Sequence, residues 1–123
     1  MMFRTMLWMM LLACGVTYAA DARPQAKVVV VELFTSEGCS SCPPAELQLA
    51  LNAKQPPVAG VTILPLAWHV DYFNDPWNDP FSSRQWTARQ SEYSQRFGGP
   101  NYTPQMVVDG TSEFVGGEKK SFN

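Results

Sequence analysis

Cysteine and histidine are scarce in this sequence. Of its 123 residues, 3 are cysteine and 1 is histidine. So few cysteines exclude a small exported scaffold that several disulfides hold together. Any cysteine pair that does occur is therefore a candidate for chemistry.

The sequence also lacks a large excess of charge and long apolar runs. Its formal net charge is −2 at pH 7, which gives no reason to expect a nucleic-acid partner. No apolar stretch is long enough to span a membrane as a helix of the mature protein. The length allows one domain, and we expect no bound cofactor.

The N-terminus has the features of a secretion signal. Arg4 provides a positive charge, residues 6–13 form a short apolar run, and small residues follow. Candidate cleavage sites lie in Thr17–Ala19 and Ala20–Ala22. We therefore predict a signal peptide over residues 1–19, with a buried first strand or helix as the alternative.

Removal of the signal would also remove Cys14. The alternative is a lipid anchor at Cys14, because residues 11–14 loosely resemble a lipobox, although Leu12 fits that motif poorly. Beyond the signal we expect a polar lead-in over residues 20–26 and one domain over residues 27–123. We expect the protein to be periplasmic or secreted.

The most informative stretch places two cysteines between a predicted strand and a predicted helix. Val28–Phe34 is almost continuously apolar, Cys39 and Cys42 follow, and Pro43 and Pro44 fit only the first turn of a helix. At that position, unpaired N–H groups and the helix dipole favour the thiolate, the form that attacks disulfides. The layout is typical of a redox-active pair.

The remaining elements alternate between strands and helices. In order, the patterns predict strand Val28–Phe34, a helix with Leu47, Ala50 and Leu51 on one apolar face, strand Val61–Trp68, a helix from a Ser82–Gln85 capping box to about Phe97, strand Gln105–Val108, a turn at Asp109–Gly110 and strand Glu113–Val115. Pro65 indicates that the second strand lies at an edge or contains a bulge. The order β-α-β-α-β-β predicts an α/β fold with a central mixed sheet. The thioredoxin fold has the same order of elements.

Four blocks of sequence carry a closer resemblance. They are Val31–Ala45, Pro65–Tyr72, Thr87–Gln90 and Tyr102–Gly110. Together they resemble the bacterial family called domain of unknown function 1223, whose members are exported thioredoxin-like proteins. The resemblance covers roughly Val28 to Gly116 and implies a thioredoxin-like fold with a redox site.

The sequence departs from this family at its end. Such folds continue past the hairpin with a helix that covers one face of the sheet, whereas only Glu118–Asn123 remain here. We expect the covering helix to be missing. The chain is then an inactive, truncated family member, a fragment, or a protein whose open sheet face a partner covers.

The cysteine pair supplies the predicted reactive groups. Cys39 is the candidate nucleophile, and Cys42 is the candidate resolving thiol that attacks the mixed disulfide. The alternatives are a static disulfide and half of a zinc site.

The resemblance also implies a substrate-binding segment. In thioredoxin-like proteins a cis-proline preceded by a residue such as threonine lies against the cysteine pair, and Thr103 and Pro104 match this pattern. An ordinary trans-proline that enters an edge strand is the alternative.

Two acidic residues bear on the reactivity of the pair. Glu32 interrupts the apolar strand, and burial would raise its pKa so that it could relay protons to Cys42. The alternative is a solvent-facing strand residue. Glu37 precedes Cys39 closely, and its charge would raise the pKa of the Cys39 thiol.

The single histidine allows a competing function. With Cys39 and Cys42, His69 would complete a three-ligand site for copper or another soft metal, whereas a loop histidine bonded to backbone is the alternative. The loop beyond it contains Tyr72, Phe73 and Trp77, which form either an apolar lip for substrate or packing beneath the loop.

We therefore predict an exported thiol–disulfide oxidoreductase that acts on protein or small-molecule thiols and disulfides. The alternatives are a soft-metal binding protein and an inactive truncated family member. The sequence does not choose between a reductant, an oxidant and an isomerase.

Overall fold

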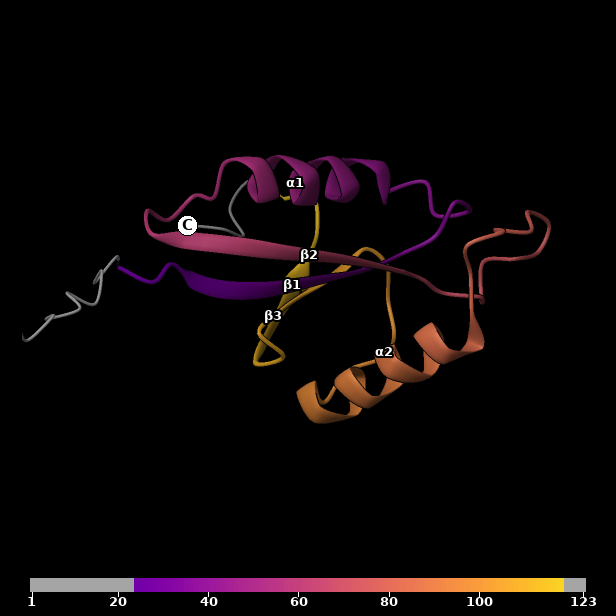
Figure 1. Ribbon diagram of the computed structural model, residues 1–123. Coiled ribbons are helices and arrows are strands. Elements are labelled where there is room, and N and C mark those ends of the chain that lie inside the picture. The colour runs from indigo at the N-terminus through magenta and orange to yellow at the C-terminus, as the bar shows by residue number, and fades with distance from the viewer. Residues whose placement is uncertain (1–23, 119–123) are drawn as a thin grey trace, which may run out of the picture.

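A four-stranded sheet with one helix on each face forms the fold (Figure 1). The computed structural model describes residues 24–118, so the predicted signal peptide and Cys14 lie outside the described residues. The elements are β1 (Lys27–Thr35), α1 (Pro43–Lys54), β2 (Val61–His69), α2 (Arg84–Phe97), β3 (Gln105–Val108) and β4 (Ser112–Val115). The predicted order and the mixed sheet are confirmed, with bounds that shift mostly by one or two residues.

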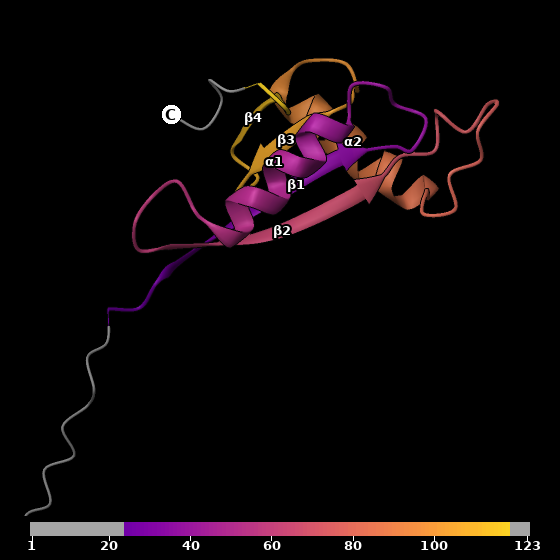
Figure 2. The ribbon, with the colours of Figure 1, turned by 90° about the horizontal axis from the view of Figure 1, so that it is seen from above.

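The strand order β2-β1-β3-β4 fixes which ends of the strands lie together. β1 pairs in parallel with β2 and antiparallel with β3, and β3 and β4 form a hairpin. Asp109 and Gly110 both have positive φ, as a tight hairpin turn requires. The carboxyl ends of β1 and β2 and the start of β3 therefore lie at the same end of the sheet (Figure 2). Pro65 lies in β2, which is an edge strand as predicted.

The two faces of the sheet have separate apolar cores. The core on the α1 face consists of Val31, Leu33, Ala45, Leu49, Ile63 and Met106. The core on the α2 face consists of Phe34, Val70, Tyr93 and Val107. Because side chains alternate along β1, Glu32 lies on the α2 face, opposite Val31 and Leu33.

The prediction of the buried face of α1 was wrong. Leu47 and Leu51 are 61% and 55% exposed, whereas Ala45 and Leu49 are buried against the sheet. Apolar residues occur on both sides of this helix, so the periodicity alone does not identify the packed side. On the packed side, Ala45 in the first turn and Leu49 belong to the core of this face.

The N-terminus of α2 also differs from the prediction. Ser83, not Ser82, is the capping residue, and its hydroxyl accepts a hydrogen bond from the backbone N–H of Gln85. Ser82 instead donates to the carbonyl of Asp79.

Part of the α1 face is open. No helix follows β4 within residues 24–118, and a hollow of about 640 Å³ remains beside α1, lined by side chains that include Val29, Val108 and Phe114. Among the same residues, no helix has the length and apolar character needed to cross a membrane.

Candidate active site

Cys39 and Cys42 form a disulfide at the start of α1. Their Cα atoms are 5.4 Å apart, and Cys42 occupies the N-cap position of the helix. Cys42 is fully buried, and Cys39, on the outer side of the pair, is 5% exposed. The pair lies where the sequence predicted it, between the end of β1 and the first turn of α1.

The start of α1 has fewer free N–H groups than the sequence analysis assumed. Pro43 and Pro44 occupy the first two helical positions and have no N–H. The next N–H groups, of Ala45 and Glu46, both donate to the carbonyl oxygen of Cys42. The helix dipole remains, but these groups leave no direct backbone donor for a sulfur at this end.

Thr103 provides a polar contact to the outer sulfur. Its Oγ1 lies 3.2 Å from Sγ of Cys39, and the Thr103–Pro104 peptide bond is cis, as the resemblance implied. The Ser41 hydroxyl lies farther from the same sulfur, at 3.7 Å. The structure therefore brings Cys39, Cys42, Thr103 and Pro104 together at the end of the sheet where β1 and β2 finish and β3 begins.

A buried network of polar side chains supports the Thr103–Pro104 segment. Gln90 is fully buried in α2, and its Nε2 donates to the carbonyl of Tyr102 at 2.7 Å and to Oε1 of Gln105 at 3.0 Å. Its Oε1 accepts a hydrogen bond from the hydroxyl of Tyr72 at 2.9 Å. The residues on both sides of Thr103–Pro104 are thus held by one side chain of α2.

The network extends to β4. Glu113 accepts hydrogen bonds from Nε2 of Gln105 at 2.5 Å and from the hydroxyl of Tyr102 at 3.0 Å. Burial, with the adjacent carboxylate of Glu113, raises the pKa of Tyr102 and keeps its hydroxyl protonated as a donor. The sequence analysis missed these residues, and the one available signal was a glutamine at the start of the apolar strand Gln105–Val108.

Glu32 differs from its prediction. It is buried on the α2 face, where it accepts hydrogen bonds from Nε1 of Trp68 at 2.8 Å, from Nε of Arg89 at 2.6 Å and from the hydroxyl of Tyr93. Burial raises the pKa of Glu32, but these three donors together bring it below its ordinary value. The expected upward shift was wrong, and the proton relay to Cys42 stays a prediction.

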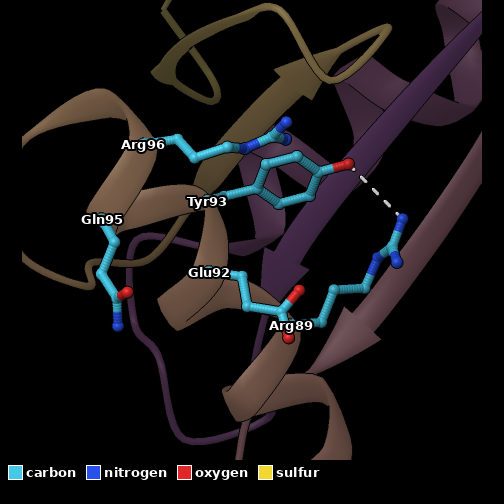
Figure 3. Close-up of a pocket in the computed structure, with 5 residues that line it drawn as sticks. All are labelled: Arg89, Glu92, Tyr93, Gln95 and Arg96. Carbon is cyan, nitrogen blue, oxygen red and sulfur yellow. Dashed lines mark hydrogen bonds between the residues drawn. The ribbon is translucent and has the colours of Figure 1, made fainter.

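Two of the donors to Glu32, Arg89 and Tyr93, also border a polar hollow on α2. The guanidinium groups of Arg89 and Arg96 lie 5.5 and 4.9 Å from the ring centroid of Tyr93 (Figure 3). The hollow has a volume of about 540 Å³, and Glu92 and Gln95 complete its lining. It contains none of the predicted site residues.

Another carboxylate lies on the same face of the sheet as α1. Oε1 of Glu46, in the first turn of the helix, accepts a hydrogen bond from the hydroxyl of Thr35 at 2.6 Å. Sequence analysis did not single out this residue.

His69 pairs with a buried aspartate. Nδ1 of His69 lies 2.7 Å from Oδ2 of Asp79, which also accepts a hydrogen bond from the backbone N–H of Glu37 at 3.0 Å. Burial raises the pKa of Asp79, but the Glu37 N–H, His69 and the N–H of Phe81 together bring it below its ordinary value. Asp79 therefore connects the end of β2 to the cysteine loop.

The structure does not bring the alternative metal ligands together. Within residues 24–118, no three side chains of His, Cys, Asp or Glu form a group that could hold a metal ion. Cys39 and Cys42 are joined to each other, and His69 is occupied by Asp79.

Comparisons with known proteins identify the family. A crystal structure of a protein from Agrobacterium tumefaciens is similar, with 39% sequence identity and a TM-score of 0.64 over 76% of this chain. The chain spans 41% of that protein's length. None of the curated proteins matches. The sequence profile of the family described as protein of unknown function (DUF1223) matches residues 30–123, and the chain therefore belongs to this family.

Proposed function

We propose that this chain is an exported thiol–disulfide oxidoreductase of the thioredoxin type, with Cys39 and Cys42 as its reacting pair. The observation that carries the proposal is the hydrogen bond from the Thr103 hydroxyl to Sγ of Cys39. It sets a donor and the adjacent Pro104 against a cysteine pair at a helix N-terminus. The β-α-β-α-β-β order and the family's resemblance to thioredoxin-like proteins support the same conclusion.

The reaction follows from the arrangement of the pair. A thiolate of a partner dithiol attacks Sγ of Cys39, the bond between Cys39 and Cys42 breaks, and Cys42 leaves as a thiolate. The partner's second thiolate then attacks the partner sulfur of this mixed disulfide, so that Cys39 leaves as a thiolate. The partner loses two electrons and two protons, and the pair gains them. The reverse sequence reduces a partner disulfide.

The roles of the two cysteines follow from their positions. Cys39 is the outer residue and retains some exposure, whereas Cys42, at the N-cap of α1, is fully buried. An incoming sulfur therefore reaches Cys39 first. Thr103 and Pro104 would also contact the substrate chain, as the resemblance implies, and Glu32 stays a candidate proton carrier.

Export is part of the proposal and rests on the N-terminal sequence. The predicted signal peptide over residues 1–19 would deliver the domain to an oxidising compartment, where a cysteine pair can cycle.

The reduction potential of the pair tests the proposal. The full chain is equilibrated with mixtures of reduced and oxidised dithiothreitol, an uncharged dithiol, and free thiols are then trapped and counted. We expect a reversible two-electron transition that C39S abolishes. A folded protein whose pair remains oxidised below about −300 mV would instead contain a static structural disulfide, and the proposal would be wrong.

A further inference from the structure

Three large aromatic side chains are exposed on the loop that follows β2. In this loop, residues 70–83, Trp77 is 72% exposed, Phe81 is 66% exposed and Tyr72 is 45% exposed. Phe73, which the sequence analysis grouped with Tyr72 and Trp77, instead packs against the core on the α2 face. The exposed aromatic set is therefore Tyr72, Trp77 and Phe81.

The loop lies directly against the cysteine loop. A Cβ atom added to Gly38 would be 2.9 Å from the carbonyl oxygen of Phe73, so the two backbones are in close contact. The carboxylate of Asp79 binds the N–H of Glu37. Both contacts involve the two residues before Cys39, and both views show the loops at the same end of the sheet (Figures 1 and 2).

Side-chain hydrogen bonds hold the loop in place. Nδ2 of Asn74 donates to the hydroxyl of Ser82 at 2.8 Å, and the N–H of Asp79 donates to Oδ1 of Asn74 at 3.3 Å. At its start, Asp71 accepts a hydrogen bond from the hydroxyl of Thr87 at 2.6 Å. The aromatic set is thus displayed by a tied loop, and exposed aromatic groups on a tied loop are typical of a binding surface.

The surface beside the disulfide is acidic. The loop contains Asp71, Asp75 and Asp79 but no lysine or arginine, and Glu37 is exposed in the adjacent cysteine loop. His69 is paired with Asp79, which is buried, and the nearest lysine or arginine along the chain is Arg84 at the start of α2. The carboxylates left facing solvent favour a positively charged partner and disfavour an anionic one.

We propose that the substrates of this site are polypeptides in which apolar residues and lysine or arginine flank the reacting cysteine. Tyr72, Trp77 and Phe81 receive the apolar groups, and Glu37 and Asp75 attract the cationic groups, which also bind aromatic faces. Small anionic thiols such as glutathione are poor substrates for the same reason. This inference rests on the proposed function and adds its substrate class.

Two matched peptides test the substrate class. Each contains one cysteine flanked by a leucine on one side, with either two lysines or two glutamates nearby, and each is activated as a mixed disulfide with thionitrobenzoate. The protein is the reduced full chain with C42S and with C14S, which removes the other thiol. Its Cys39 thiolate attacks the peptide sulfur, forms a stable mixed disulfide and releases coloured thionitrobenzoate. Rates with dithiothreitol correct for the intrinsic reactivity of each peptide.

We expect the lysine peptide to react about tenfold faster than the glutamate peptide at low ionic strength, and the ratio to fall towards one in about 1 M salt. D75N should lower the ratio about two- to threefold, whereas E92Q, which removes an equally exposed charge on α2, should not. W77A should slow the lysine peptide several-fold, whereas V58S, at the far end of the sheet, should not.

The outcomes separate this inference from the proposed function. Equal corrected rates for the two peptides, or equal effects of the variants and their controls, would overturn the substrate class and leave thiol–disulfide exchange in place. Failure of Cys39 to react with either peptide would overturn both.

Discussion

The hydroxyl of Thr103 donates a hydrogen bond to Sγ of Cys39 at 3.2 Å, across 64 positions of sequence. This hydrogen bond is important because the first N–H groups of α1 are not available to the sulfur. Pro43 and Pro44 remove the first N–H groups of α1, and the following ones are bound to the carbonyl of Cys42. A side-chain hydroxyl from the segment before β3 therefore replaces the backbone donors that usually surround a cysteine at a helix N-terminus.

The first prediction concerns this donor. T103V removes the hydroxyl and keeps the branched shape, so the thiolate of Cys39 loses its hydrogen bond in the reduced protein. We expect the pKa of the Cys39 thiol to rise by about one unit, the equivalent of one hydrogen bond to a charged group. The rate of alkylation of Cys39 by iodoacetamide as a function of pH measures this pKa.

T111V is the matched control, because the Thr111 hydroxyl lies in the β3–β4 turn and donates to the carbonyl of Val108. Identical alkylation profiles for T103V and the unmodified protein would show that the contact does not act on the thiolate.

The second prediction separates the two cysteines. In a chain that also carries C14S, C42S should form a stable mixed disulfide with a small activated disulfide, since its outer sulfur remains available. On the same C14S background, C39S should react at least about tenfold more slowly, because Cys42 is fully buried. Mass spectrometry of the intact protein counts the adduct over time. A faster reaction of C39S would reverse the assigned roles.

The third prediction concerns the acid sensitivity contributed by Glu32. Its pKa is lower in the folded protein than in the unfolded chain, so its contribution to stability is present above about pH 4.5 and is lost as the pH falls towards the folded value. E32Q should lower the free energy of unfolding by about 2 kcal/mol at pH 7, because the buried end of the ion pair loses its charge. Urea unfolding at about pH 7 and pH 3 measures the difference, which should shrink at pH 3.

E92Q, an exposed change on the same helix as Arg89, serves as the control and should alter stability by less than about 0.5 kcal/mol. An E32Q deficit that is equally large at both pH values would contradict the shifted pKa. If Glu32 also relays protons to Cys42, E32Q will in addition change the pH profile of disulfide exchange.

The fourth prediction concerns the support of the Thr103–Pro104 segment. Q90A removes three hydrogen bonds, of which the one to Gln105 is buried, and leaves the carbonyl of Tyr102 without this donor. We expect a loss of about 2 kcal/mol or more in the free energy of unfolding, measured in urea. Q95A is exposed on the same helix and should be nearly neutral. Equal stability of the two variants would mean that Gln90 does not hold the segment.

The predictable parts of this protein are those whose signals are local. A few adjacent residues are enough to recognise each of three features: the apolar run of β1, the turn at Asp109–Gly110, and the pair Cys39 and Cys42. The order β-α-β-α-β-β along the chain then followed from their succession. These features were sufficient to predict both the α/β fold and the position of the disulfide.

The remaining features depend on contacts that neighbouring residues do not specify. The buried face of α1 could not be chosen because Leu47 and Leu49 are equally apolar. The pKa of Glu32 depends on donors from β2 and α2, of which Arg89 is 57 positions away. Burial was one of two alternatives for this carboxylate, but its partners were not foreseen, and the partners determine the direction of the shift.

The segment after β4 meets the site at a point that leaves no room. A Cβ atom on Gly116 would lie 2.7 Å from Cβ of Ala45, and the N–H of Gly116 donates to the carbonyl of Pro104 at 3.0 Å. Three segments thus pack closely around Gly116: the first turn of α1, the cis-proline segment and the end of the hairpin. If the activity of every single-substitution variant is measured, no replacement of Gly116 should be tolerated. Gly116 takes no part in the chemistry, yet it would then be as sensitive to substitution as the two cysteines.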